Sequence, residues 1–461
     1  MPAAPPPAEI AAETRRILAL AWPVMLTSLN WTILHVTDVV VVGLVGTEQV
    51  AALGASRSLT FVTIVTGLAW LSGVLVFTAR ADGAGDLKRT GQVLREGLAL
   101  ALLLGLIIAA ILFFLATPLL AAMGVADAVV GPAAPVVQVM ALSFPFQLTI
   151  VAASFFLEGV SRPRRVMTVN LLMLPLNAVL AWALSGGHLG LPALGAVGAA
   201  AATAIASAFG AVGMLSAVWT LPRAASRGVH DMSRAAWRPV PAGAVRLAAF
   251  GIVPGIASGL ELAGFSILIA LSTQLGDATA HAFQIVFSVH NVTFGVALGL
   301  GSAAGVRAGN AVGEGRPVEA VPRTMIAVSV AALLTAILAI VLVIARVPLV
   351  GAFPAAGAVH LLALEMLPLW VPFILFDGVQ VVLVYALRSL GDQVAAGVNS
   401  IIAYFLVTGG AGWWLVHAGA GPMGLVYASG AGMVAAAALH GGRFALISAR
   451  LRKSSAPAFS N

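Results

Sequence analysis

Three carboxylic acids lie in the middle of long apolar stretches of this sequence: Asp38, Glu261 and Asp377. An ionised acid at the centre of a membrane helix costs about 2.5 to 3.5 kcal/mol, so such a residue normally faces a bundle interior or a water-filled cavity. Carboxylates can bind Na⁺ together with other oxygens, and they bind protons near neutral pH when water is excluded. The positions of the three acids therefore indicate movement of an ion or a charged compound across a membrane.

Glu261 and Asp377 each follow a proline within an apolar stretch. Glu261 lies seven residues after Pro254, and Asp377 lies five residues after Pro372. A proline in a membrane helix frees backbone carbonyl groups of the preceding turn. Backbone carbonyls can therefore supply oxygen ligands beside each acid, so Glu261 and Asp377 are both candidate coupling-ion residues, for a proton or for Na⁺.

A second group of polar residues is predicted to bind the substrate or an ion of the N-terminal half. Its acid is Asp38, and His35 lies one turn earlier on the same face. His35 could serve Asp38 as part of a proton relay or through an orienting hydrogen bond, and we favour the orienting bond. For Asn177 and Gln380, a hydrogen bond between helices is an equal alternative to ligand binding. The further members are Asn177, Gln284 and Gln380.

Apolar segments of about 20 residues carry these groups, and each is long enough to span a membrane. The chain has 461 residues, 60% hydrophobic and 9% charged, with a mean hydropathy of +1.03. A soluble domain is less apolar and more charged. The sequence therefore predicts an all-α polytopic membrane protein with twelve transmembrane helices. They are expected at 17–43, 50–79, 96–117, 133–158, 166–185, 193–221, 246–273, 280–306, 323–346, 358–387, 394–417 and 421–449.

Lys and Arg residues lie mostly in alternate connections between these segments. All 24 of them except Arg57 and Arg346 fall on one side of the predicted membrane. Basic loops stay in the cytoplasm, so we expect both termini there, in a bacterial-type cytoplasmic (inner) membrane. The formal charge of +7 is spread over helix ends, and a nucleic-acid partner is not expected. The absence of cysteine excludes disulfides and thiolate metal sites.

The two halves of the chain repeat each other. ARADGAGDLKRT from Ala79 matches VRAGNAVGEGRP from Val306, and LEGVSRP from Leu157 matches LRSLGDQ from Leu387. Six helices per half give both halves the same orientation, and substrate sites in such carriers lie near mid-membrane. We predict two pseudo-symmetric six-helix lobes. The N-terminal lobe is 1–221, a cytoplasmic linker is 222–244, and the C-terminal lobe with a short cytoplasmic tail is 245–461.

The sequence resembles the multidrug and toxin extrusion (MATE) transporters, which are cation-coupled drug exporters. The resemblance covers the chain from Ala21 to about Arg443, and the order of the motifs makes it specific. These motifs are TDVVVVGLVGTEQVAALG with Asp38, GIVPGIASGLELAGF with Glu261, AAGVRAGNAVGEG, FDGVQVVLVYALRSLGD with Asp377, and LPLNAVLAWALSGGHLGLPALGAVGAA with Asn177. Met173 stands where relatives can place a second Asn, which argues against a complete cation site in the N-terminal lobe.

The resemblance implies two lobes around a central cavity, with a cation site at Glu261 and Asp377 in the C-terminal lobe. It implies a secondary active antiporter that exports cationic or amphipathic drugs and toxins in exchange for Na⁺ or H⁺ by alternating access. The partners would be these small molecules and the lipid bilayer. No cofactor beyond the coupling ion is expected, and the chain is expected to be a monomer.

Three other functions would each require sequence features of their own. A lipid-intermediate flippase of the same superfamily would need several arginines facing its cavity. Another twelve-helix carrier would need a loop signature with basic residues where Gly83 and Asp86 stand. An intramembrane enzyme would need paired Asp-rich motifs or a proteolytic constellation, which the sequence lacks, so no enzymatic activity is expected. Near the end of the tenth segment, Arg388 and Asp392 are interpreted as a charge pair.

Overall fold

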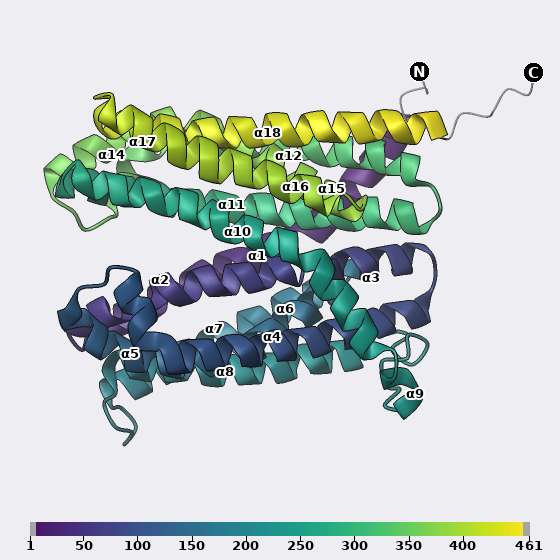
Figure 1. Cartoon of the computed structure of the whole chain (residues 1–461), viewed down its shortest axis with the longest axis horizontal. Helices are drawn as coiled ribbons and strands as arrows, with labels where there is room; N and C mark the ends of the chain where they lie inside the picture. Colours follow the sequence, from purple (N-terminus) through teal and green to yellow (C-terminus); the bar gives the residue numbers. More distant parts are fainter. Residues whose placement is uncertain (1–5, 455–461) are drawn as a thin grey trace, which may run out of the picture. The chain divides into compact units, whose positions relative to one another are not determined.

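The chain folds into helices joined by short connections, in a computed structural model that describes residues 6–454 (Figure 1). No strand occurs among these residues. The first half contains α1 (Pro7–Gly43), α2 (Thr47–Trp70), α3 (Gly73–Gly83), α4 (Leu87–Ala122), α5 (Asp127–Ala141), α6 (Phe144–Gly159), α7 (Pro163–Gly186) and α8 (Gly195–Trp219). The short α9 (Arg234–Trp237) follows. The second half contains α10 (Val240–Gln274), α11 (Asp277–Gly313), η1 (Pro317–Glu319), α12 (Ala320–Ile344), α13 (Arg346–Gly351), α14 (Gly357–Trp370), η2 (Val371–Phe373), α15 (Ile374–Ser389), α16 (Gln393–Ser400), η3 (Ile401–Gly409), α17 (Gly410–His417) and α18 (Gly421–Ser454).

Eleven helical segments of the described chain are long and apolar enough to cross a membrane, and one bent pair makes the twelfth. The bent pair is α5 and α6, whose axes differ by 47°. The bend lies just before Pro145, which has no N–H to continue the helix of α5. The predicted segment 133–158 is therefore a broken span, and the prediction of twelve helices is confirmed with this pair counted once.

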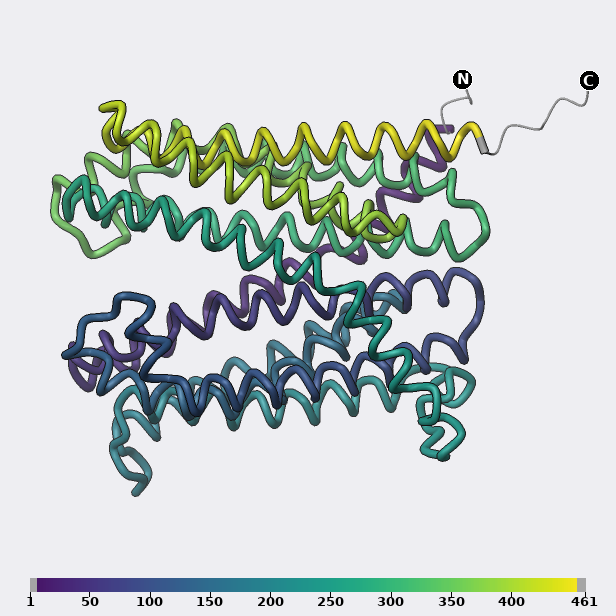
Figure 2. The backbone as a smooth tube through the Cα atoms, in the orientation of Figure 1, coloured from purple at the N-terminus to yellow at the C-terminus, as the bar shows by residue number. Residues whose placement is uncertain are grey.

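The helices pack into two compact units. Unit 1 comprises residues 6–28, 83–85 and 256–454 of the described chain, and unit 2 comprises residues 29–82 and 86–255. Figure 2 traces α1 and α10 as continuous tubes, and each of these helices contributes one part to each unit. The lobe boundaries 1–221 and 245–461 stay a prediction from the repeat. Packing assigns the start of α1 and the start of α10 to the opposite unit.

The start of α1 is fixed in unit 1 by charge and by apolar packing. Arg307 of α11 donates to both carboxylate oxygens of Glu13, at 2.6 and 2.7 Å. Such a bidentate arginine–carboxylate pair is among the strongest polar contacts in proteins. One turn later, Ile17 and Ala21 are fully buried in a core cluster with Leu300 and other residues of α11 and α12. The first part of α1 is therefore an integral part of unit 1.

The start of α10 is fixed in unit 2 by a close approach to α2. The indole Nε1 of Trp70 donates to the carbonyl of Ala248 at 2.9 Å. The rings of Phe77 and Phe250 lie edge to face, with centroids 5.3 Å apart. Gly251 has no side chain, and a Cβ at this position would overlap the carbonyl oxygen of Trp70. Close approach of helix backbones is the usual reason for small residues in membrane helices.

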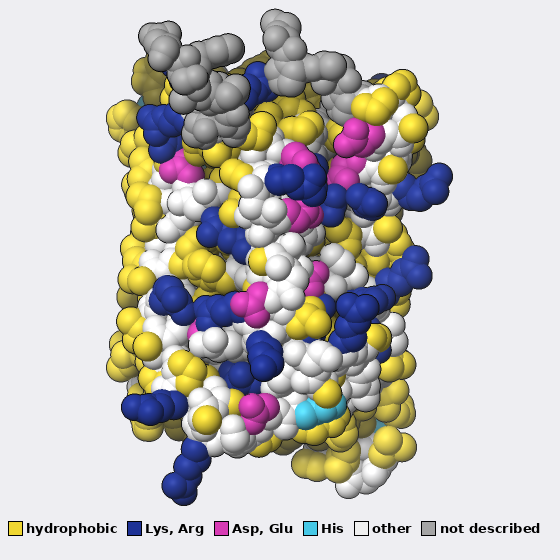
Figure 3. All heavy atoms as spheres, turned by 90° about the vertical axis from the view of Figure 1, so that its right-hand side faces the viewer, with side chains coloured by type: hydrophobic (Ala, Val, Ile, Leu, Met, Phe, Trp, Pro, Cys, Tyr) yellow, Lys and Arg dark blue, Asp and Glu magenta, His cyan; other side chains and the backbone are white. Residues whose placement is uncertain are grey.

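The connection between α11 and α12 carries an ionic network. Arg323 donates to both carboxylate oxygens of Glu314, and Arg316 contacts Glu314 and Glu319. The hydrogen bonds from Arg323 lower the pKa of the Glu314 carboxyl below its ordinary value. Figure 3 shows Lys and Arg side chains mixed with Asp and Glu on one face of the molecule. Mixed charge of this kind suits the water-exposed ends of membrane helices.

Candidate functional site

Glu261 and Asp377 both lie in unit 1, on α10 and α15. Asp377 is 2% exposed and stands in the first turn of α15, where the free N–H groups of a helix start favour an acid. The preceding turn is η2, which contains Pro372. The proline thus interrupts the span shortly before the acid. That Glu261 and Asp377 form one site stays a prediction.

Two neutral groups donate to the carboxylate of Asp377. Gln380 Nε2 lies 3.1 Å from Oδ1, and the hydroxyl of Tyr404 lies 3.3 Å from the same oxygen. Tyr404 is fully buried on η3, a π-helical segment. Among the ion pairs of residues 6–454, none includes Glu261 or Asp377. Within residues 6–454, the carboxylate of Asp377 is therefore held by neutral donors alone.

Gly264 lies one turn after Glu261 and brings α10 against η3. A Cβ at this position would overlap the carbonyl oxygen of Tyr404. On the opposite side of the same contact, a Cβ at Gly409 would lie 3.8 Å from Cα of Gly264. Two glycines therefore let the backbones approach. This approach holds the helix of Glu261 beside the tyrosine that binds Asp377.

His290 of α11 is the aromatic neighbour of this cluster. It is 7% exposed, and its ring stacks on Phe287 and Phe294 with centroids 5.7 and 5.9 Å away. Trp370 meets the same ring edge-on at 5.3 Å. The Nδ1 atom of His290 is buried and has no hydrogen-bond partner in the described part of the chain. No group of three or more His, Cys, Asp or Glu side chains gathers there into a metal site. A Na⁺ ion at the acids would need hydroxyl, amide or carbonyl oxygens as further ligands.

The predicted pair of Arg388 and Asp392 does not form. Arg443 of α18 binds both carboxylate oxygens of Asp392, with Nη2 2.9 Å from Oδ1. Arg388 is 9% exposed and lies over the ring of Tyr385, 5.7 Å from its centroid. The interpretation is wrong because a third residue from a helix distant in sequence takes the acid.

Asp38 lies in unit 2, is fully buried on α1, and has three partners. Asn177 Nδ2 donates to Oδ1 at 2.7 Å, Arg57 Nη2 donates to Oδ2 at 2.6 Å, and the Thr203 hydroxyl is 3.5 Å from Oδ2. These partners come from α7, α2 and α8. The grouping of Asp38 with Asn177 is therefore found in the structure. The arginine makes this acid one half of an ion pair, in contrast to the acids of unit 1.

His35 does not bind Asp38 through its ring. The imidazole meets Trp31 and Phe61 edge-on, with centroids 6.4 and 6.5 Å away. Its main-chain carbonyl accepts a hydrogen bond from Arg57 Nη1 at 2.7 Å. Within residues 6–454, no hydrogen bond joins the imidazole to Asp38. The favoured orienting bond is absent because the guanidinium occupies the place beside the carboxylate.

Neither glutamine belongs to the unit that contains Asp38. Gln380 belongs to the cluster of Asp377 in unit 1. Gln284 is exposed on α11, also in unit 1. Sequence reasoning missed three partners, Tyr404, Thr203 and Arg57. Tyr404 and Thr203 are each a single polar residue in an apolar run, IIAYFL and GAAAATAIA, and this isolation is the signal that could have pointed to them.

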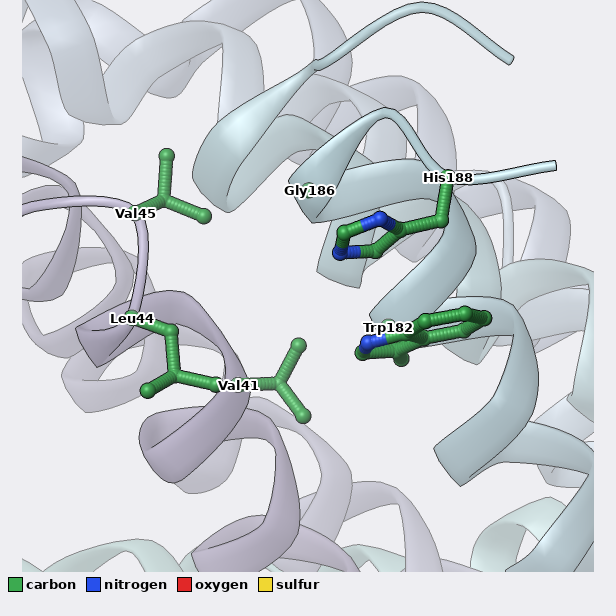
Figure 4. Close-up of a pocket in the computed structure, with 6 residues that line it drawn as sticks. All are labelled: Val41, Leu44, Val45, Trp182, Gly186 and His188. Atoms are coloured by element: carbon green, nitrogen blue, oxygen red, sulfur yellow. The ribbon is translucent and has the colours of Figure 1, made fainter. Parts of the chain in front are cut away.

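A cavity of about 210 Å³ lies in unit 2, beyond the Asp38 cluster (Figure 4). Val41 is one turn past Asp38 on α1, and Trp182 is five residues past Asn177 on α7. The rings of Trp182 and His188 stack, with centroids 4.1 Å apart and planes 17° apart. In Figure 4 the two rings face the side chains of Val41, Leu44 and Val45 across the cavity. The lining residues are Val41, Leu44, Val45, Trp182, Gly186 and His188.

The MatE family model matches residues 23–183 and 255–411 of the chain. A probable multidrug resistance protein NorM of Caulobacter vibrioides is 34% identical over 87% of this chain and 84% of its own length. A NorM protein of Burkholderia pseudomallei is 32% identical over 97% and 96%. The multidrug resistance protein PmpM of Pseudomonas aeruginosa is 29% identical over 86% and 82%.

Solved structures share the fold. The eukaryotic MATE transporter AtDTX14 has a TM-score of 0.85 at 19% identity, covering 96% of this chain and 99% of its own. A multidrug resistance MATE family transporter in an outward-facing conformation has a TM-score of 0.84 at 20% identity, covering 96% and 97%. These structures share the all-α fold of this chain along nearly its whole length. Because the family model covers most of the sequence and relatives above 30% identity align along nearly all of it, the chain belongs to the MATE family of transporters.

Proposed function

We propose that this protein is a secondary active antiporter that exports cationic or amphipathic drugs and toxins in exchange for Na⁺ or H⁺. It would act as a monomer by alternating access in a bacterial cytoplasmic membrane and would need no resident cofactor. The relatives named as multidrug resistance proteins support the substrate class. The observation that carries the proposal is the buried Asp377, which has only neutral donors and lies within electrostatic reach of Glu261.

Two like charges near each other in a low-dielectric setting resist ionising together. Uptake of one proton or one Na⁺ ion would relieve the repulsion between Glu261 and Asp377. When Asp377 is ionised, Tyr404 and Gln380 stabilise its charge by hydrogen bonds. An ion drives a conformational change only through its different affinity for two states. Coupling would arise if the ion-bound and drug-bound forms favour opposite states.

Transport by the purified protein in proteoliposomes tests the coupling. Two gradients are imposed in separate experiments, a Na⁺ gradient at equal pH and a pH gradient without Na⁺. We expect one of them to drive the accumulation of ethidium. Collapse of the effective gradient with a matching ionophore should stop the uptake, and protein-free liposomes serve as the control. Ethidium movement that ignores both gradients would contradict the antiport mechanism.

The orientation of the chain remains a prediction that cysteine labelling can check. The sequence contains no cysteine, so Ser226→Cys in the connection before α9 and Met123→Cys after α4 introduce single exposed thiols. If Lys- and Arg-rich connections face the cytoplasm, an impermeant maleimide added to intact cells should label Met123→Cys alone. Lysed cells should show labelling of both variants. Labelling of Ser226→Cys from outside intact cells would reverse the proposed topology.

A further inference from the structure

The carboxylate of Asp38 already holds a cation that belongs to the protein. Arg57 reaches it from α2, with Nη2 2.6 Å from Oδ2, while Nη1 donates to the carbonyl of His35 at 2.7 Å. A charge-assisted contact of this length is strong, and the guanidinium cancels most of the attraction of the carboxylate for any other cation. A second cation therefore gains little at Asp38 while Arg57 stays in place.

The two partners of this ion pair are held with different firmness. The side chain of Asp38 is 1% exposed and is fixed by Asn177 at 2.7 Å, whereas the side chain of Arg57 is 15% exposed. Arginine has a long flexible stem and can move its charged head toward polar surroundings without a change in its helix. Arg57 is therefore the partner that can leave.

The surroundings of the pair suit a cation with aromatic rings. Trp31, His35 and Phe61 form a row of edge-to-face rings, in which His35 lies one turn from Asp38 on α1 and Phe61 one turn from Arg57 on α2. Aromatic faces attract organic cations, and the attraction grows when water is excluded. Oδ1 of Asn177 is buried and has no donor in the described chain, so a hydrogen-bond acceptor stays open beside the carboxylate.

We propose that Arg57 is a tethered cation, which an aromatic cationic substrate must displace in order to bind at Asp38. An aromatic cation gains contacts with Trp31 and Phe61 that offset the lost contacts of Arg57. A small hydrated ion gains no such contacts, so Arg57 acts as a selectivity residue of unit 2. The inference rests on the proposed export of cationic compounds and adds the residue that decides which of them reach this carboxylate.

Equilibrium binding of ethidium to purified, detergent-solubilised protein tests this selectivity. All variants carry Glu261→Gln and Asp377→Asn, so that the acids of unit 1 contribute no charge. Arg57→Gln should bind ethidium about tenfold more tightly than this parent, equivalent to about 1.4 kcal/mol. Arg57→Lys should lie between them, because a compact ammonium cannot keep both contacts of the planar guanidinium. A neutral dye such as Nile red should bind all three equally.

A further variant assigns the gain to Asp38. Adding Asp38→Asn to Arg57→Gln should return the ethidium affinity to that of the parent or below. Replacing both buried charges together is well tolerated in proteins, so this variant is expected to fold. If Arg57→Gln alone is not monodisperse, the comparison of Arg57→Lys with the parent decides.

Ethidium binding by Arg57→Gln and Arg57→Lys that is no tighter than the parent overturns the proposal. A gain that persists after Asp38→Asn overturns it as well, because the carboxylate would then play no part. The assay uses no ion gradient, and the acids of unit 1 are already neutral. Failure of the antiport mechanism would appear separately, as gradient-independent ethidium movement by the wild-type protein.

Discussion

Glu261→Gln and Asp377→Asn should each reduce ion-driven ethidium transport by at least about tenfold while protein levels persist. Each change keeps the size of the side chain and removes its charge. A hydrogen bond or ligand bond to a charged group contributes roughly 1.5 to 3 kcal/mol, so its loss weakens ion binding by one to two orders of magnitude. Neither acid forms a salt bridge within residues 6–454, so neutralisation breaks no direct ion pair. The measurement is the initial rate of uptake into proteoliposomes under the effective gradient.

Tyr404→Phe provides a matched variant for this experiment. It removes one donor to Asp377 at 3.3 Å and leaves both carboxyl groups in place. We expect a shift in the ion concentration for half-maximal transport and a smaller loss of rate than for Asp377→Asn. Wild-type transport with unchanged ion dependence in both acid variants would show that coupling does not use Glu261 and Asp377. The acid of unit 2 would then be the remaining candidate.

Gly264→Ala should destabilise the protein and impair transport although it adds a single methyl group. The new Cβ would overlap the carbonyl oxygen of Tyr404, which belongs to the backbone and cannot rotate away. Overpacking of a well-packed contact costs about 1 to 3 kcal/mol. Relief of the overlap moves α10 away from η3, and Glu261 moves with it. The midpoint of thermal unfolding and the rate of ion-driven transport should therefore fall together.

Gly410→Ala is the control for the effect of a methyl group as such. No atom lies within 4 Å of a Cβ built at Gly410, and alanine favours a helix over glycine. This variant should keep the transport rate and should unfold at the same temperature as the wild type or higher. Equal behaviour of Gly264→Ala and Gly410→Ala would show that the approach of α10 to η3 carries no weight.

The fold was largely predictable because long apolar runs indicate the membrane-spanning helices and basic loops indicate their orientation. The acids of unit 1 were predictable for a related reason, since an ionised side chain such as Glu261 within an apolar run needs a function. The proline before Asp377 also pointed to a break, which the structure places at η2. These signals are local in the sequence and need no knowledge of how helices pack.

Partners across helices could not be predicted. The sequence predicts only on which side of the membrane Arg57 of α2 lies. Its contact with Asp38 depends on how α2 is rotated about its axis relative to α1, which the sequence does not reveal. The same limit led to the wrong pairing of Arg388 with Asp392, because Arg443 comes from α18. The apolar pattern also does not reveal that η3 is π-helical, so the direction of the Tyr404 side chain on it could not be predicted.

The division of α1 and α10 between two units bears on how the chain is made. Glu13 and Arg307 are separated by 294 residues, so the ribosome releases the start of α1 long before its ion-pair partner exists. Synthesis from the N-terminus usually lets the first domain fold first. Here the first helix cannot reach its final packing until α11 has entered the bilayer. A chain cut before α10 would likewise leave α2 without the backbone that receives the indole of Trp70. Two separately expressed halves would have to exchange these helix ends to assemble, so the two halves of the chain are not independent folding units.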